Sequence, residues 1–342
     1  MKYSILTCAS FGSSGSGVVT DYLNEYSGIK NLGDYEFRFL QDYDGISTLE
    51  DALVNSPHRL NSDIAIQNYI RYIDRQCGTF LNRRYEKFFK GKWKKISHDF
   101  LNKIIDIKWP GYWEQYQIME PNKFQAFLKY QLYPRILRLL AGNKKYIAHY
   151  LPKRDMFFAA PSEEYFIKCV REYVDDLCKV IDPNHEYRYI YMDQITPPAN
   201  ISKYERYFDS VKTIVVDRDP RDYYLENVLK YGEGWVPKSV EKFALLYRKH
   251  REQASKYSDS SNVLRIKFED AIFNYNEFEN SIINFLDLDK DSHINPKKFF
   301  IPEKSIANTR LWQKRDVNID LIHKIENLLP EYLYDFNSVR PD

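Results

Sequence analysis

Residues that build structural metal sites are sparse in this 342-residue sequence. Its four cysteines, Cys8, Cys77, Cys169 and Cys178, stand far apart without a CxxC pair, and the seven histidines are scattered. A structural zinc site is therefore not expected, and we assign no metal. Unpaired thiols in a chain of this length indicate a reducing compartment, so we predict a cytoplasmic protein.

Long hydrophobic runs and a large excess of one charge are also absent. No apolar segment approaches the roughly 20 residues that a membrane-spanning helix needs, and the opening MKYSILTCASFG favours a strand over a secretory signal. The 50 Lys and Arg and the 48 Asp and Glu give a net charge of +2. This balance provides no global attraction to nucleic acid or to an anionic membrane, so any anion site must be local.

The hydrophobic content of 44% is enough for a substantial core, and the pattern of apolar residues favours an α/β fold. Strands are predicted at 4–8, 187–192, 212–216 and 263–268, with helices beginning near Gly17 and covering 162–181, 277–286 and 318–329. Strands that alternate with helices predict a parallel sheet flanked by helices, within one domain spanning 1–342.

Residues 62–140 are aromatic and basic, and their periodicity is mostly helical. We interpret this region as a helical insertion within the single domain, on the side where an acceptor would bind. The 29 tyrosines give weak support to a sugar-binding surface, because an aromatic face packs on a sugar ring while the hydroxyl hydrogen-bonds. The charged segment 289–315 is expected to be a loop.

Glycine is scarce, with 12 in the chain, yet Gly12, Gly15 and Gly17 fall within the run GSSGSG between the first strand and the first helix. Such a turn can gather backbone N–H groups around a phosphate, although it can also be an ordinary strand-to-helix turn. In the Walker pattern GxxxxGK[ST], Val18 and Val19 would take the lysine and Ser/Thr positions. An ordinary ATPase or GTPase is therefore not expected.

A second register, Ser14-Gly15-Ser16-Gly17 followed by two valines, resembles the phosphate loop of the sulfotransferase superfamily. The resemblance implies that this loop holds the 5′-phosphosulfate end of 3′-phosphoadenosine 5′-phosphosulfate (PAPS). The family has Lys or Arg just before that serine, whereas this chain has Ser13. The loop can therefore supply N–H groups and hydroxyls but no charge.

The segment 214–222, IVVDRDPRD, resembles the family's strand that leads into Arg-x-Pro-x-Asp. The resemblance implies that Arg218 binds the 3′-phosphate of the nucleotide. A guanidinium suits this task because it offers two parallel donors to a phosphate. The alternative is that Arg218 pairs with Asp222 and that Pro220 only begins a helix.

The family's second 3′-phosphate contact is a serine eight residues after that arginine, where this chain has Glu226. A carboxylate would repel a phosphate. Asn227 is a candidate to replace the serine if Glu226 turns away to pair with Lys230, one helical turn later. The other alternative is a donor without a 3′-phosphate.

Two later segments extend the resemblance. The strand that ends at Glu269 and Asp270 matches one after which the family continues into a helix, and we expect both carboxylates to be structural. The segment 305–314 is similar to one that closes over the nucleotide in the family. It makes Arg310 and Lys314 candidate phosphate ligands, although a solvated basic loop explains it as well.

Sulfuryl transfer needs a base for the acceptor hydroxyl and positive charge at the leaving phosphate. In sulfotransferases the base is a His or Glu near the end of a middle strand, which points here to Asp193 after strand 187–192. His149 is the second candidate. Lys153, Arg154 or Arg310 could replace the missing loop cation. Each candidate also has an ordinary structural explanation.

Together these segments predict an enzyme that moves a sulfuryl group from PAPS to a hydroxyl group, with a glycan as the expected acceptor. A phosphotransferase that uses a nucleotide without a 3′-phosphate is the main alternative. A non-catalytic nucleotide- or glycan-binding module on the same fold is the third. Nucleic acid is not an expected partner, because the net charge is nearly balanced.

Overall fold

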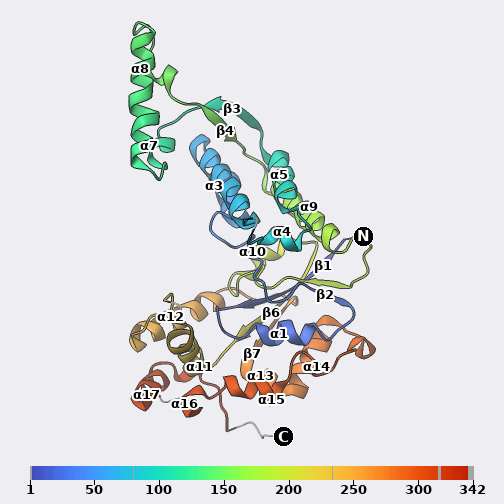
Figure 1. Cartoon of the computed structure of the whole chain (residues 1–342). Coiled ribbons are helices and arrows are strands. Elements are labelled where there is room, and N and C mark those ends of the chain that lie inside the picture. Colours follow the sequence, from blue (N-terminus) through green and yellow to red (C-terminus); the bar gives the residue numbers. More distant parts are fainter. Residues whose placement is uncertain (1, 80, 233, 315–316, 338–342) are drawn as a thin grey trace.

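The computed structural model describes residues 2–79, 81–232, 234–314 and 317–337. Its centre is a five-stranded parallel sheet (Figure 1) with the strand order β2-β5-β1-β6-β7. The strands are β2 (Ile29–Asn31), β5 (Tyr189–Tyr191), β1 (Ser4–Ser10), β6 (Ser210–Asp217) and β7 (Val263–Lys267). The predicted α/β class with a parallel sheet is confirmed. Of the five strands in this sheet, β2 had no counterpart in the sequence prediction.

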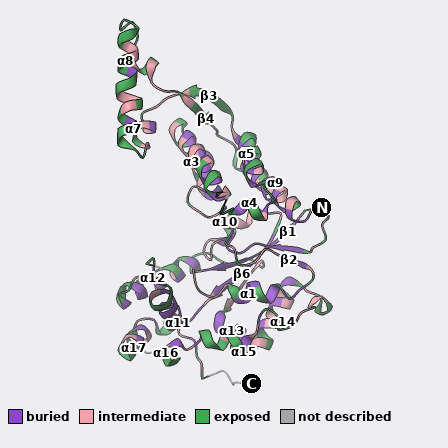
Figure 2. Cartoon of the chain, viewed as in Figure 1, coloured by how far each residue is buried: buried purple, intermediate pink, exposed green. Residues whose placement is uncertain are grey.

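Helices cover both faces of the sheet (Figure 2). Strands β1 and β6 are therefore buried along most of their length. Leu6 and Cys8 of β1 face one core cluster, and Ile5 faces the other, as the two-residue period of a strand requires. Helices α1 (Gly17–Leu23), α13 (Phe268–Phe273) and α14 (Tyr275–Leu286) supply the first cluster. The second contains α3 (Arg59–Cys77), α5 (Trp93–Ile104) and α9 (Glu163–Ile181).

A third cluster lies beside the carboxyl end of β6. It joins α11 (Pro220–Tyr224) and its π-helical continuation η4 (Leu225–Tyr231) to α12 (Val240–Ser255) and α17 (Ile319–Leu328). Pro220 begins α11, where a proline needs no N–H partner, and the Asp219 side chain caps it by accepting a hydrogen bond from the Arg221 N–H. Segment 289–315 is not a plain loop, because it contains η5 (Lys290–Ser292), α15 (Pro302–Ser305), η6 (Ile306–Asn308) and α16 (Leu311–Lys314).

The region predicted as a helical insertion consists of two different parts. Helices α3 and α5, with α4 (Tyr85–Phe88) between them, pack into the main core against α9. Beyond them an arm projects away from the sheet (Figure 1). Its stem is the antiparallel pair β3 (Ile107–Gly111) and β4 (Arg154–Phe158), which helical periodicity did not predict.

The arm carries α6 (Gln115–Ile118) and one continuous helical stretch formed by α7 (Lys123–Phe127), η2 (Leu128–Leu132) and α8 (Tyr133–Leu140). The remaining short elements are α2 (Ile46–Glu50), η1 (Asp51–Asn55), η3 (Ile147–Tyr150), α10 (Ile201–Glu205) and η7 (Pro330–Tyr332). Among the residues that the structure describes, no helix has the length and apolar character to cross a membrane.

Candidate functional site

The loop between β1 and α1 requires glycine at two positions. Gly12 and Gly15 have φ angles of +82° and +101°, in the region that favours glycine. A side chain on Gly15 would overlap the Phe268 ring, and a Cβ on Gly12 would lie 2.9 Å from Cη2 of Trp235. The loop is therefore a shaped turn, not a flexible linker.

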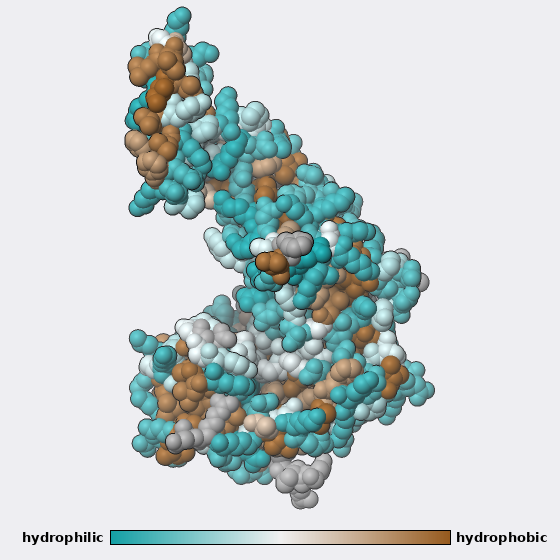
Figure 3. All heavy atoms as spheres, viewed as in Figure 1, coloured by the Kyte–Doolittle hydropathy of each residue, from teal (hydrophilic) through white to brown (hydrophobic). Residues whose placement is uncertain are grey.

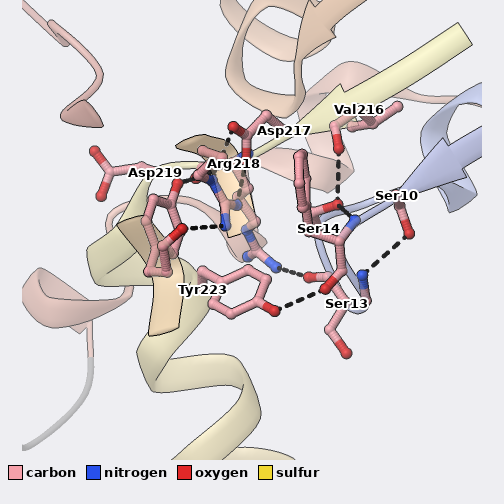
Figure 4. Close-up of polar contacts among 12 residues, drawn as sticks. Ser10, Ser13, Ser14, Val216, Asp217, Arg218, Asp219 and Tyr223 are labelled. Carbon is pink, nitrogen blue, oxygen red and sulfur yellow. Dashed lines mark hydrogen bonds and ion pairs between the residues drawn. The ribbon is translucent and has the colours of Figure 1, made fainter. Parts of the chain in front are cut away.

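This turn leaves several donors free. Within the described part of the chain, the backbone N–H groups of Gly15, Ser16 and Gly17 have no hydrogen-bond partner, and the Ser16 hydroxyl does not cap α1. Ser14 differs, because its buried Oγ donates to the Val216 carbonyl at 2.8 Å and accepts from the Phe11 N–H at 3.2 Å (Figure 4). The Ser14 side chain thus holds the loop against β6, while its neighbours can meet an anion.

Arg218 follows β6 and lies under this loop. It is only 5% exposed, its guanidinium is 4.7 Å from the centre of the Phe268 ring, and it donates to the Ser13 carbonyl at 3.4 Å (Figure 4). It also donates to the Asn308 carbonyl at 2.5 Å, which ties η6 to the loop. Among the described residues, the Nε atom of Arg218 has no partner. The alternative pairing of Arg218 with Asp222 is not found, because Asp222 accepts the N–H groups of Arg310 and Leu311.

Glu226 occupies the place beside Arg218. Its carboxylate pairs with Lys230, as expected, but it does not turn away from the arginine, because it also lies 3.2 Å from Nη2 of Arg218. Burial opposes ionisation of Glu226, but the hydrogen bond from Lys230 and the charge of Arg218 outweigh it and lower the pKa. The Asn227 side chain is buried and its amide donates to the Tyr223 carbonyl, and the described cleft lining does not include it.

One cleft of about 540 Å³ brings the loop, Arg218 and the end of β5 together. It collects most of the residues predicted from the sequence: Ser13, Gly15, Ser16, Gly17, Asp193 and Arg218. Its described lining is acidic, however, with Arg218 and Lys230 as the cations against the carboxylates of Asp21, Asp34, Glu36, Asp193 and Glu226. The sequence did not predict this acidity, because Asp34 and Glu36 come from the segment after β2.

Asp193 lies two residues after the end of β5 and is 2% exposed. Burial raises its pKa well above the ordinary value, although the Tyr191 hydroxyl donates to it at 3.1 Å; the nearby Glu36 and Asp34 raise it further. Tyr191 is held in turn by Thr20 of α1, with 2.9 Å between the hydroxyl oxygens. A raised pKa makes the ionised carboxylate a stronger base, and the ionised form is the one that can take a proton from a hydroxyl.

Three other predicted residues lie away from the cleft. His149 is exposed in η3 on the arm, so the structure does not bring it to the loop. The Arg310 guanidinium stacks on Phe273, 5.2 Å from the ring centre. Lys314 donates to carbonyls of its own segment, including that of Thr309 at 2.6 Å. The residues that neighbour these three in the sequence could not reveal where their side chains lie.

The proposed substitutes for the loop cation also lie elsewhere. Lys153 and Arg154 belong to the arm, where the Arg154 guanidinium is 3.2 Å from the centre of the Tyr116 ring. Besides Arg218, Lys230 is the cation in the described cleft lining, and it is held by Glu226. Ser13 carries no positive charge, and Lys230 replaces that charge only partly because it is paired with Glu226.

A second cleft of similar size includes Gly12 of the loop in its lining. It shares Glu36 with the first cleft. It is lined by Trp235, His250, Gln194, Arg38 and Gln41, among others. His250 was missed because it lies in the polar run RKHREQ of α12, where the sequence has no local signal. Burial, followed by the charge of Arg251, lowers its pKa, so the imidazole is neutral at neutral pH.

The carboxylates expected to be structural have that role. Glu269 is fully buried and accepts the Asp219 N–H at 2.9 Å, and Asp270 accepts the Tyr334 hydroxyl at 2.8 Å. Both therefore fix the segments that position Arg218. In the described ranges, no group of three or more His, Cys, Asp or Glu side chains is arranged to hold a metal ion.

No family model and no curated protein sequence matches this chain. Several solved structures resemble it over nearly its whole length. The sulfotransferase domain of the Synechococcus PCC 7002 olefin synthase is 13% identical, with a TM-score of 0.42 over 98% of this chain and 97% of that one. The sulfotransferase domain of the curacin biosynthetic pathway is 11% identical, with a TM-score of 0.44 over 97% and 98%.

A third similar structure is sulfotransferase STF9 from Mycobacterium avium, which is 9% identical with a TM-score of 0.38 over 97% of this chain and 76% of that one. Retinol dehydratase, solved with androsterone and the inactive cofactor PAP, is 13% identical with a TM-score of 0.33 over 100% and 84%. Since the identities and TM-scores are this low, the activity has to be argued from the residues of this chain.

Proposed function

We propose that this chain transfers a sulfuryl group from PAPS to a hydroxyl group of an acceptor. The observation that carries the proposal is the convergence of free N–H groups at Gly15, Ser16 and Gly17 with Arg218 in one cleft. The cleft lies at the carboxyl ends of parallel strands, where ligands bind in open α/β sheets. Loop donors suit the phosphosulfate end, and a buried guanidinium suits a second phosphate.

In the proposed reaction the acceptor oxygen forms a bond to sulfur while the bond from sulfur to the 5′-phosphate oxygen breaks. The electron pair leaves with the phosphate, giving adenosine 3′,5′-bisphosphate (PAP). Asp193 takes the proton of the acceptor hydroxyl, because burial makes its carboxylate basic. The loop N–H groups stabilise the charge that develops on the leaving phosphate.

The acceptor site proposed is the second cleft, on the other side of Gly12. Trp235 and His250 line it, and Gln194, the residue after Asp193, lines it as well. The adjacent positions of Asp193 and Gln194 therefore join the two clefts at the end of β5. A half-exposed tryptophan beside the Arg38 guanidinium suits a sugar ring, which supports a glycan acceptor.

Binding of the product nucleotide tests this function. Millimolar PAP should raise the melting temperature of the wild-type chain and should not raise that of Arg218→Ala, which lacks the proposed phosphate ligand. Arg265→Ala is the matched control, because that arginine pairs with Asp259 at the surface outside the cleft. The absence of any shift with PAP in the wild type would refute nucleotide binding.

A second candidate function is favoured by one observation, the pairing of Arg218 with Glu226. A carboxylate at this position would accept hydrogen bonds from a ribose hydroxyl and would repel a 3′-phosphate. The donor would then be a nucleotide without a 3′-phosphate, and the chain would be a phosphotransferase. Stronger stabilisation by ATP or ADP than by PAP would favour this candidate.

A further inference from the structure

The helical stretch of the arm, from Lys123 to Leu140, is anchored on one side only. On its inner side, Ala126 and Pro134 are buried, and the Tyr130 ring packs on Tyr112 with 5.7 Å between ring centres. These contacts hold the stretch to the loop that follows β3. They also fix which side of the helix turns away from the arm.

The outer side of this stretch is apolar and exposed. Leu140 is 80% exposed, Phe124 68% and Leu139 66%. Other large apolar side chains that are at least 40% exposed extend the same surface: Phe127, Leu132, Tyr133 and Ile136. Positions 132, 136, 139 and 140 are spaced three and four residues apart, so they share one helix face. Figure 3 shows this hydrophobic patch along the projecting arm.

Positive charge dominates around the patch. Between residues 121 and 153 the sequence has seven Lys or Arg and no Asp or Glu, although the whole chain has a net charge of only +2. Lys129 pairs with Glu120 at 3.2 Å. Within the described residues, the other six form no ion pair: Lys123, Arg135, Arg138, Lys144, Lys145 and Lys153. These cations are therefore free to meet an anionic surface.

We propose that this arm docks on the surface of an anionic phospholipid bilayer. An amphipathic helix with large apolar side chains on one face and cations beside them lies in the interface, with its apolar face among the acyl chains. The long Lys and Arg side chains reach the phosphate groups, and Tyr133 and Tyr146 suit the headgroup level. Because the arm projects from the α/β body, a planar surface can approach it (Figure 1).

Charge complementarity selects this occupant. Exposed patches of this kind are unusual on monomeric proteins and mark interaction surfaces. A second copy of the arm would bring free cations close to free cations, whereas an anionic membrane attracts each Lys and Arg near its surface. This inference does not depend on the proposed sulfuryl transfer, because it uses no residue of either cleft.

Flotation of the full chain with vesicles tests the proposal. The wild type should bind vesicles that contain phosphatidylglycerol far better than vesicles of phosphatidylcholine alone. The apolar variant Ile136→Ser/Leu139→Ser/Leu140→Ser should bind on the order of 100-fold more weakly. The charge variant Arg135→Gln/Lys144→Gln/Lys145→Gln should lose on the order of 10- to 100-fold, chiefly with anionic vesicles.

The matched control is Tyr43→Ser/Leu245→Ser/Ile294→Ser, which removes three exposed apolar side chains outside the arm. It should bind vesicles as the wild type does. The proposal is overturned if the wild type ignores anionic vesicles, if the charge variant binds as well as the wild type, or if the control loses as much as the apolar variant. A dimer in sedimentation that the apolar variant dissociates, without vesicle binding, would assign the patch to a second copy instead.

Discussion

Replacement of Glu226 by serine should turn the weakest feature of the proposed donor site into its missing phosphate ligand. In the wild type the Glu226 carboxylate lies 3.2 Å from Nη2 of Arg218, where a 3′-phosphate would have to bind. Two unit charges about 4 Å apart interact by roughly 4 kcal/mol at an effective dielectric constant near 20. Lys230 neutralises part of the carboxylate, so the net repulsion is smaller.

We expect Glu226→Ser to strengthen PAP binding by about 1.5–3 kcal/mol, which is roughly 10- to 100-fold in Kd. Without ligand the variant should be less stable by about 3–5 kcal/mol, because Arg218 loses its partner in a buried pair. PAP should therefore raise the melting temperature of the variant more than that of the wild type. The affinity for ADP, which has no 3′-phosphate, should rise much less.

Titration calorimetry with PAP and ADP measures this difference directly. Glu226→Gln separates charge from shape and should retain most of the gain. Glu241→Ser is the control, because Glu241 also pairs with a lysine, Lys324, but is exposed on α12 away from the cleft. If a folded Glu226→Ser variant binds PAP no better than the wild type, Arg218 does not hold a 3′-phosphate and the reasoning fails.

Three other substitutions test the remaining parts of the site. Gly15→Ala should destabilise the chain and abolish PAP binding, because the added methyl overlaps Phe268 at a φ of +101°; a normal melting temperature with intact binding would contradict this. Asp193→Asn should lower kcat about 10²- to 10⁴-fold while PAP affinity stays unchanged, and an unaltered rate would exclude Asp193 as the base. Burial, followed by the charge of Asp219, raises the pKa of Glu269 to about 8, so the folded state keeps a proton that the unfolded state loses above its ordinary pKa near 4.5. The free energy of unfolding should therefore fall as the pH rises from 4.5 to 8, by up to ~1.4 kcal/mol per pH unit from this group. Urea titrations of Glu269→Gln at several pH values should lack this part of the pH dependence.

The parts of the site that the sequence predicted are local ones. A buried strand, a glycine-rich turn and an apolar helix face follow one another between residues 4 and 23, and each has its own signature. Strand β6 leads into Arg218 and Pro220 in the same way. Because the carboxyl ends of parallel strands meet at one edge of a sheet, the loop, Arg218 and Asp193 could be expected to come together.

The parts that were missed depend on contacts between distant segments. Asp34 and Glu36 line the cleft because the chain after β2 turns over the end of β5, where the Phe37 N–H donates to the Asp193 carbonyl at 2.7 Å. Trp235 covers Gly12 for a similar reason. His149 does not lie at the cleft, because β3 and β4 carry its segment out on the arm. No local pattern contains this information.

The total charge of the chain hides two regions of opposite sign. The net charge of +2 gave no reason to expect a membrane partner, yet seven Lys or Arg and no acidic residue occupy 121–153 on the arm. The cleft that contains Arg218, in contrast, is lined by five carboxylates and two cations among the described residues. Salt screens exposed charges on a scale of about 10 Å, so each surface acts through its own side chains and not through the sum. Composition could exclude a global field, but only the placement of these charges by the fold indicates which anion each surface attracts or repels.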